Sequence, residues 1–258
     1  MPKAPINGIQ MYFEDTGGSG LPVVFLHGAG GNHESWFQQV PEFSKRYRCI
    51  TIDHRGFGQS PDVPNGPSGD AFVSDMEALV AHLGLGQMAI VCQSMGGRTG
   101  LGYTLAHPEV VKALVLADTT GGVTDEEMEK VRAELVPPVQ DRTDLLNRAL
   151  GVPFQQQFPE KAKLYQEISA KNPPGGFQAG RSYANTPQVG QLAGLKVPTL
   201  LLVGEVDVLA PPPVMELMHQ RMPGSRLAVV PGAGHSVYFE KPEEFNRIVL
   251  DFLAEVVR

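Results

Sequence analysis

The feature that most constrains the fold is the segment Cys92-Gln93-Ser94-Met95-Gly96, which lies between an apolar run and a glycine-rich stretch. The apolar run 88–92 predicts a buried strand, and the stretch that follows predicts a helix. A serine at a sharp turn from strand to helix exposes its hydroxyl, and the next backbone amide, that of Met95, points towards the substrate. This arrangement is typical of a nucleophilic serine.

The same segment departs from the usual pattern at one position. The turn is strained, so the residues two positions before and after the serine must be small. Gly96 meets this requirement, whereas Cys92 stands where glycine is usual. We expect the turn to tolerate the small thiol side chain. Cys49 and Cys92 both fall in predicted buried strands, and we interpret them as reduced core thiols.

Predicted strands alternate with predicted helices along most of the chain. Six apolar runs predict strands: 22–27, 49–53, 88–92, 111–118, 198–205 and 226–232. This alternation implies a mainly parallel sheet covered by helices on both faces. Residues 121–195 differ, because they read as short helices separated by proline and glycine clusters. An insertion there lies over the carboxyl ends of the strands, so we interpret it as a lid.

Two polar residues follow late predicted strands. Asp207 comes after the run 198–205, and His235 comes after the run 226–232. Serine, then an acid, then histidine is the chain order of the catalytic triad in α/β hydrolases.

The chain resembles an α/β-hydrolase-fold enzyme from end to end. The landmarks that carry the resemblance are His27-Gly28, Asp53 with Arg55, Gly56, Gly58 and Ser60, Gln93-Ser94-Met95-Gly96-Gly97, Gly204-Glu205-Val206-Asp207 and Gly234-His235. The resemblance implies a mostly parallel, eight-stranded sheet flanked by helices, with a helical lid inserted after the sixth strand. It divides the chain into a core of residues 1–120 and 196–258 and a lid of residues 121–195.

The resemblance also implies the roles of the site residues. Ser94 is the nucleophile, His235 the general base and Asp207 the residue that orients the histidine. The backbone amides of Ala29 and Met95 form the oxyanion hole. Asp118 is a rival acid, because some members of the family carry their carboxylate after that strand.

The remaining histidines suggest no cofactor. His27 and His54 belong to structural loop motifs of the family, and we expect them to fix loop hydrogen bonds. His33 lies near the oxyanion loop, where it either lines the pocket or sits at the surface. We expect no metal, because no pair of histidines has the spacing of a zinc site. The glycines form neither a dinucleotide fingerprint nor a P-loop, so we expect no cofactor.

The substrate is less constrained than the chemistry. We predict hydrolysis of carboxylic esters or lactones of small, largely apolar substrates. The candidate walls of the substrate pocket are Trp36, Leu145, Leu146, Val208 and Leu209. Alternatives are a triad-dependent carbon–carbon bond hydrolase, or a lyase of the menaquinone-pathway type in which Arg98 binds a substrate carboxylate. A small-molecule receptor with a slow or silent triad is an alternative of another class.

Composition limits the partners. The chain has 258 residues and a formal net charge of -7. It has no basic cluster, so we expect no nucleic acid. No run approaches the roughly 20 apolar residues that cross a bilayer, so we expect no membrane span. The N-terminal residues lack the pattern of a secretory signal, so we expect a cytoplasmic protein. Its partner is then a small-molecule substrate, and either a monomer or a homodimer is compatible with the sequence.

Overall fold

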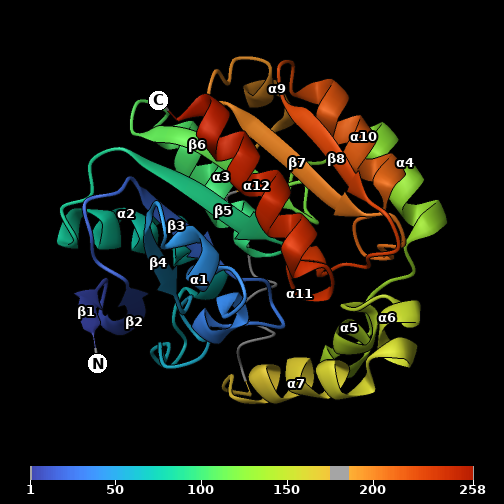
Figure 1. Cartoon of the computed structure of the whole chain (residues 1–258), viewed down its shortest axis with the longest axis horizontal. Coiled ribbons are helices and arrows are strands. Elements are labelled where there is room, and N and C mark those ends of the chain that lie inside the picture. The colour runs from blue at the N-terminus through green and yellow to red at the C-terminus, as the bar shows by residue number, and fades with distance from the viewer. Residues whose placement is uncertain (1, 175–185, 258) are drawn as a thin grey trace.

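The computed structural model describes residues 2–174 and 186–257, whose strands form one eight-stranded sheet in the order β1-β2-β4-β3-β5-β6-β7-β8 (Figure 1). The strands are β1 (Lys3–Ile6), β2 (Ile9–Asp15), β3 (Pro22–Leu26), β4 (Arg48–Ile52), β5 (Met88–Gln93), β6 (Val111–Ala117), β7 (Thr199–Gly204) and β8 (Arg226–Val230). The pairs β1–β2 and β2–β4 are antiparallel and the others are parallel. The predicted mostly parallel sheet is therefore confirmed.

The antiparallel edge of the sheet begins with a hairpin. Asn7 and Gly8 connect β1 to β2 and have φ angles of 41° and 84°. Two successive positive φ angles give a turn whose twist matches that of the flanking strands, and Asn-Gly is a favoured pair for it. The hairpin leaves the parallel strands, and the loops at their carboxyl ends, on the other side of β4.

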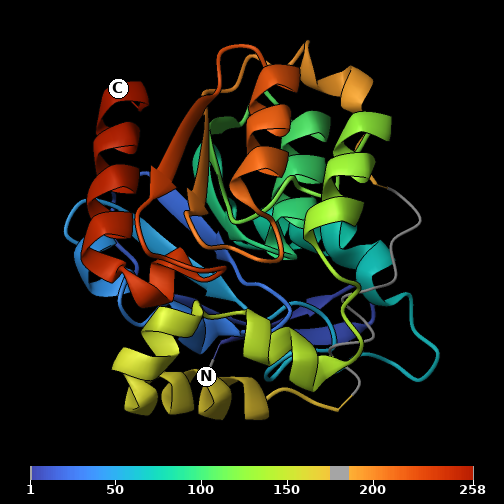
Figure 2. The same cartoon turned by 90° about the vertical axis from the view of Figure 1, so that its right-hand side faces the viewer.

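The central strands are buried on both faces because helices cover each face. In β5, Ile90 belongs to one hydrophobic cluster and Val91 to the other, as the alternation of side chains along a strand requires. The first cluster packs under α2 (Phe72–His82), α3 (Gly96–Ala106) and α10 (Pro212–Arg221), and the second packs under α1 (Val40–Phe43) and α12 (Pro242–Val256). Figures 1 and 2 show the resulting three layers.

Helices α4 to α7 lie in two places. Helix α4 (Glu126–Leu135) packs against α10. Helices α5 (Arg142–Arg148), α6 (Val152–Gln157) and α7 (Pro159–Ala170) lie together beyond one end of the sheet, as both views show, and are called the α5–α7 group below. The range 121–195, predicted as a lid, thus contains both α4, which packs against α10, and the α5–α7 group, which lies beyond the sheet. Residues 175–185 of this range lie outside the described residues.

Short helices complete the chain. They are η1 (His33–Trp36), η2 (Ser68–Ala71), α9 (Val189–Leu192) and α11 (Val237–Glu240). Helix α11 follows β8 and contacts α12. Among the described helices, none is both long enough and apolar enough to span a bilayer.

Candidate active site

Ser94 occupies a strained turn between β5 and α3. Its φ is +48°, a left-handed value that a residue with a side chain adopts only at a cost of about 1–3 kcal/mol. Gly96 allows the turn to pack against β3, because a Cβ atom there would lie 2.2 Å from the carbonyl oxygen of Leu26. The predicted need for a small residue at position 96 is thus a matter of backbone contact.

Cys92 fits this turn because another glycine makes room for it. Its side chain is completely buried, and a Cβ atom added at Gly100 would lie 2.1 Å from the Cys92 sulfur. The thiol therefore fills space that a side chain at position 100 would otherwise occupy. Burial raises the pKa of the Cys92 thiol, so this group stays protonated. Cys49 and Cys92 are both buried and free, as predicted.

The three residues predicted as a triad lie within hydrogen-bonding distance of one another. His235 Nε2 is 2.9 Å from Ser94 Oγ, and His235 Nδ1 is 2.9 and 3.0 Å from the two carboxylate oxygens of Asp207. Asp207 Oδ1 also accepts hydrogen bonds from the backbone amides of Leu209 and Ala210, at 2.7 and 2.9 Å. The loop after β7 therefore fixes the carboxylate, and the carboxylate fixes the imidazole.

Asp118, the rival acid, has a different position. It follows β6, and its carboxylate accepts hydrogen bonds from the backbone amides of Gly204 at 3.2 Å and Val237 at 3.3 Å. Burial, together with the charge of Asp207, raises its pKa well above the ordinary value. Asp118 thus connects the end of β7 to the start of α11, and it is Asp207 that contacts the ring of His235.

The amides predicted to bind an oxyanion lie beside the serine. Ala29 and Met95 line the same cavity as Ser94 and His235. Within the described part of the chain, neither backbone amide donates a hydrogen bond to another protein group. Two free donors next to a nucleophile are the elements of an oxyanion hole.

The cavity at this site has a volume of about 550 Å³. Of the predicted wall residues, Leu145 and Leu209 line it. Trp36 does not, because its ring is buried in the core between Phe25 and Tyr238. Val208 points to solvent, and Leu146 packs on the buried cluster under α12. The sequence could not show which of the five residues line the cavity, because all five are apolar and their spacing is the same whether they face the cavity, the core or solvent.

The cavity is also more charged than the sequence suggested. Arg98 of α3 and Arg132 of α4 both line it, together with Glu129. Arg132 donates a hydrogen bond to the carbonyl oxygen of Leu209 at 3.3 Å, and burial lowers its pKa. Arg132 was missed because a charge on a predicted surface helix carries no sign of the cavity behind it.

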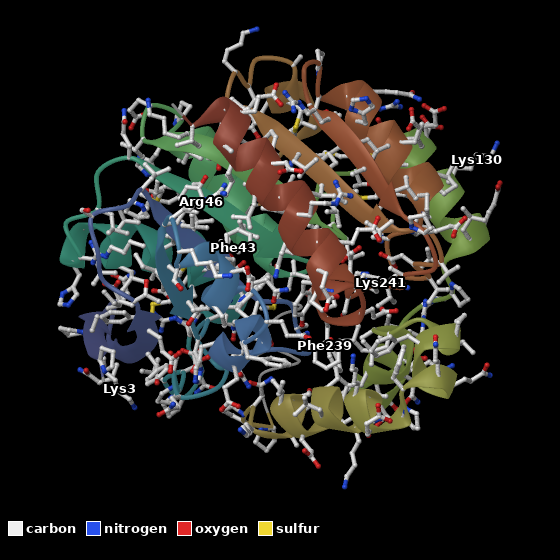
Figure 3. All side chains as sticks on the ribbon, in the orientation of Figure 1. Lys3, Phe43, Arg46, Lys130, Phe239 and Lys241 are labelled. Atoms are coloured by element: carbon white, nitrogen blue, oxygen red, sulfur yellow. The ribbon has the colours of Figure 1, made fainter. Side chains whose placement is uncertain are left out.

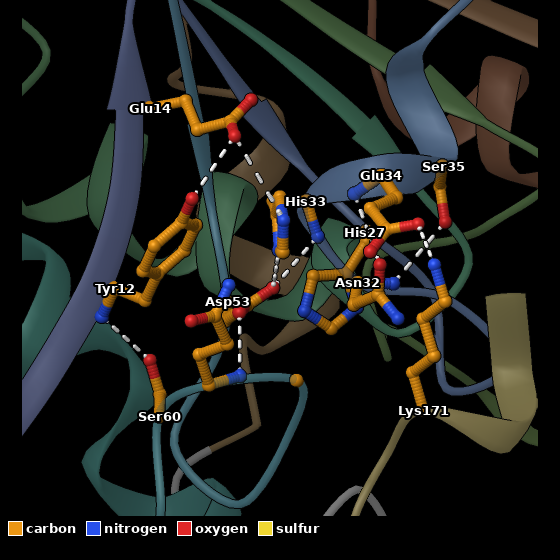
Figure 4. A network of polar contacts seen from close by, with 12 residues as sticks. Tyr12, Glu14, His27, Asn32, His33, Glu34, Ser35, Asp53, Ser60 and Lys171 are labelled. Atoms are coloured by element: carbon orange, nitrogen blue, oxygen red, sulfur yellow. Dashed lines mark hydrogen bonds and ion pairs between the residues drawn. The ribbon is translucent and has the colours of Figure 1, made fainter. Parts of the chain in front are cut away.

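His33 lies neither on the cavity wall nor at the surface. Figure 4 shows it in a buried network, where its Nδ1 is 2.7 Å from Asp53 Oδ1. Its backbone amide donates to the same oxygen at 2.7 Å, and the other carboxylate oxygen accepts from the amide of Gln59, also at 2.7 Å. Asp53 thus ties the segment after Ala29 to the loop after β4.

His27 and His54 hold loops together, in line with the prediction for them. The backbone amide of His54 donates to His27 Nε2 at 3.0 Å, and His54 Nε2 lies 3.1 Å from the hydroxyl of Thr99. Both rings are completely buried, and burial lowers the pKa of each. Over residues 2–174 and 186–257, no cluster of three or more His, Cys, Asp or Glu side chains is arranged to hold a metal ion.

Comparisons with known proteins agree with this architecture. A family model described as alpha/beta hydrolase fold matches residues 22–242. The BpoC protein of Mycobacterium tuberculosis (strain ATCC 25618 / H37Rv), whose name assigns it to the non-heme bromoperoxidases, is 30% identical over 94% of this chain and 97% of its own length. A protein of Bacillus subtilis (strain 168), named for 2-succinyl-6-hydroxy-2,4-cyclohexadiene-1-carboxylate synthase, is 28% identical over 97% of each chain.

Solved structures include a thermophilic esterase from Thermogutta terrifontis, determined with malate bound. It is 29% identical, and the superposition has a TM-score of 0.85 and covers 100% of this chain and 99% of the esterase. The names of these three proteins refer to different reactions, so likeness alone does not select one.

Proposed function

We propose that this chain, which belongs to the alpha/beta hydrolase family, is a serine hydrolase that cleaves carboxylic esters or lactones of small molecules. The observation that carries the proposal is the unbroken series of hydrogen bonds from Ser94 through His235 to Asp207. A serine hydroxyl needs an adjacent base to become nucleophilic, and the base needs a third group to hold its tautomer.

The reaction proceeds in two halves. His235 Nε2 takes the proton of Ser94 as the serine oxygen attacks the ester carbonyl. The oxyanion of the tetrahedral intermediate accepts hydrogen bonds from the amides of Ala29 and Met95. His235 then gives the proton to the leaving alcohol, and the acyl group stays on Ser94. A water molecule, deprotonated by His235, attacks this acyl-enzyme and releases the acid, while the proton returns to Ser94.

A second candidate function rests on the two arginines of the cavity. Arg98 and Arg132 line the cavity with the serine and histidine, so an anionic substrate would be attracted to it. In this candidate reaction, His235 and Ser94 remove a proton from the anionic substrate, which then eliminates a carboxylate-bearing fragment, as in a lyase. The relative named for the synthase supports keeping this candidate.

Turnover of p-nitrophenyl esters of increasing acyl length tests the first proposal. We expect repeated turnover by the wild type and a loss of at least about 10³-fold in kcat for Ser94→Ala, because the acyl-enzyme cannot form. Ser44→Ala, which changes an exposed serine on the surface, is the matched control and should keep wild-type rates.

Other outcomes select the alternatives. Turnover that survives in Ser94→Ala would overturn the serine mechanism. A single turnover without recycling would favour a receptor. The lyase would be favoured if no ester is turned over and if release of a carboxylate-bearing fragment from an anionic substrate requires both Ser94 and Arg132.

A further inference from the structure

The loop that carries His235 is held in place by side chains from elsewhere in the fold. The backbone amide of Gly234 donates to Glu240 Oε2 at 2.9 Å, and the backbone carbonyl of His235 accepts from Gln93 Nε2 at 2.8 Å. The amide of Val237 donates to Asp118 at 3.3 Å. The position of the imidazole therefore depends on three polar side chains, of which Gln93 and Asp118 belong to strand ends beneath the loop.

Glu240 differs from the other two because it also binds the α5–α7 group. Its Oε1 accepts a hydrogen bond from the backbone amide of Gly151 at 3.1 Å and a weaker one from that of Ser236 at 3.4 Å. Gly151 is the residue that directly precedes α6. One carboxylate thus joins the histidine loop to the start of a helix 89 residues away in sequence.

The histidine loop and the start of α6 are in such close contact at Gly234 and Gly151 that neither position has space for a side chain. A Cβ atom added at Gly234 would lie 2.2 Å from the backbone nitrogen of Gly151. Figure 3 shows Phe239 at the junction of α11 with the α5–α7 group, and its ring lies 5.1 Å from that of Tyr165 in α7. The hydroxyl of Tyr165 is also 3.4 Å from that of Ser236. Displacing α6 and α7 would therefore disturb the loop on which His235 sits.

Glu240 is costly to bury, which argues that its contacts matter. Glu240 is 5% exposed, and no lysine or arginine of the described chain forms an ion pair with it. Burial raises its pKa, and the amides of Gly234, Gly151 and Ser236 offset part of that effect. A carboxylate in such a place is stabilised only by its hydrogen bonds, so an isosteric amide, which can accept on one side alone, would leave a backbone donor unpaired.

The geometry points to Glu240 as a positioning residue of the hydrolase. Its carboxylate joins the His235 loop to the start of α6, and it thereby fixes the position of the general base relative to the α5–α7 group. This inference rests on the proposed function, because it assigns Glu240 an effect on the base. Glu240 does not touch the reacting atoms and acts only through the backbone around His235.

Glu240→Gln tests the inference, with Glu243→Gln as the matched control on an exposed glutamate of α12. At a temperature well below the melting point, we expect kcat to fall about 10- to 100-fold in Glu240→Gln, because a displacement of about 1 Å costs that much. KM should stay within about 3-fold, since the cavity walls other than His235 are unchanged. A purely structural role would lower the melting temperature and leave kcat unchanged, and that result would overturn the inference.

Hydrogen exchange of the wild-type protein, followed by NMR at the amides of Gly151 and Gly234, gives a test that needs no variant. Because both amides bind one carboxylate, we expect both to be protected and to open together, with equal opening free energies. Independent opening would overturn the link even if Glu240→Gln fails to fold. A wild type without turnover would contradict the proposed function. An active wild type whose kcat is equalled by that of Glu240→Gln would contradict only the role of Glu240.

Discussion

His235 with Asp207 and His33 with Asp53 form two buried histidine–aspartate pairs in the same molecule. In each pair the ring Nδ1 contacts a carboxylate, at 2.9 Å in the first and 2.7 Å in the second. In each, the carboxylate also accepts hydrogen bonds from backbone amides. The pairs differ at the second ring nitrogen. His235 Nε2 faces Ser94 Oγ at 2.9 Å, whereas His33 Nε2 lies 3.9 Å from Glu14, an exposed carboxylate.

A buried histidine–aspartate pair is thus not by itself a catalytic unit. Asp53 uses both oxygens to hold backbone segments, one at His33 and the other at Gln59, so the pair serves to fix a loop (Figure 4). Asp207 is held by its own loop and is free to orient a ring that meets a hydroxyl. The group that faces the second ring nitrogen decides the role of each pair. For His235 this group is the hydroxyl of Ser94, which follows the distant strand β5.

Replacing each histidine by glutamine should separate the two pairs most strongly. We expect His235→Gln to lower kcat on an ester substrate by about 10³- to 10⁶-fold, because no base remains for Ser94. His33→Gln should keep kcat within about 10-fold, since its ring touches no reacting atom. Steady-state kinetics of the two purified variants provides the measurement, and equal losses of kcat in both would show that the two pairs do not differ in role.

Replacing Asp53 by asparagine should give the next largest effect, which is a loss of folding stability. The amide cannot accept from both backbone segments and leaves the His33 ring without its counter-charge. We expect the free energy of unfolding to fall by about 3 kcal/mol. Urea denaturation measures this loss, with Asp251→Asn on the exposed face of α12 as a control. A loss below about 0.5 kcal/mol would show that the loop does not depend on Asp53.

The smallest expected effect concerns pH. Burial alone would lower the pKa of His33, but the hydrogen bond and charge of Asp53, with the charges of Glu14 and Glu34, outweigh it and raise the pKa above its ordinary value of 6.5. A raised pKa means that the pair stabilises the fold fully below the unfolded pKa and loses this contribution as the pH rises through the folded pKa.

We therefore expect the difference in unfolding free energy between wild type and His33→Gln to be about 1 kcal/mol near pH 5.5 and to shrink as the pH rises above about 6.5. Urea denaturation of both proteins from pH 5.5 to 9 checks this. A difference that grows with pH would reverse the assigned sign.

The sequence predicted the parts of the molecule that local patterns encode. The apolar run 88–92 corresponds to β5. Of the residues that follow late strands, His235 contacts Ser94 and Asp207 contacts His235, as their chain order implied. The order is informative because parallel strands bring their carboxyl ends together at one edge of the sheet.

What the sequence could not predict depends on pairs far apart in the chain. The partner of His33 is a carboxylate 20 residues on, and the contact of Glu240 with Gly151 spans 89 residues. Trp36 looked like a pocket wall, yet its ring is completely buried in the core. No periodicity of apolar residues distinguishes these cases, since each depends on how loops cross above the sheet.

We propose that His235 activates Ser94, and covalent labelling by a fluorophosphonate measures this activation. The wild type, His33→Gln and His235→Gln would be incubated with the reagent, and the modified residue identified by peptide mass spectrometry. We expect rapid labelling of Ser94 in the wild type and in His33→Gln, and labelling slowed by at least about 10³-fold in His235→Gln. Unlabelled wild-type Ser94, or equally fast labelling without His235, would contradict activation of Ser94 by His235.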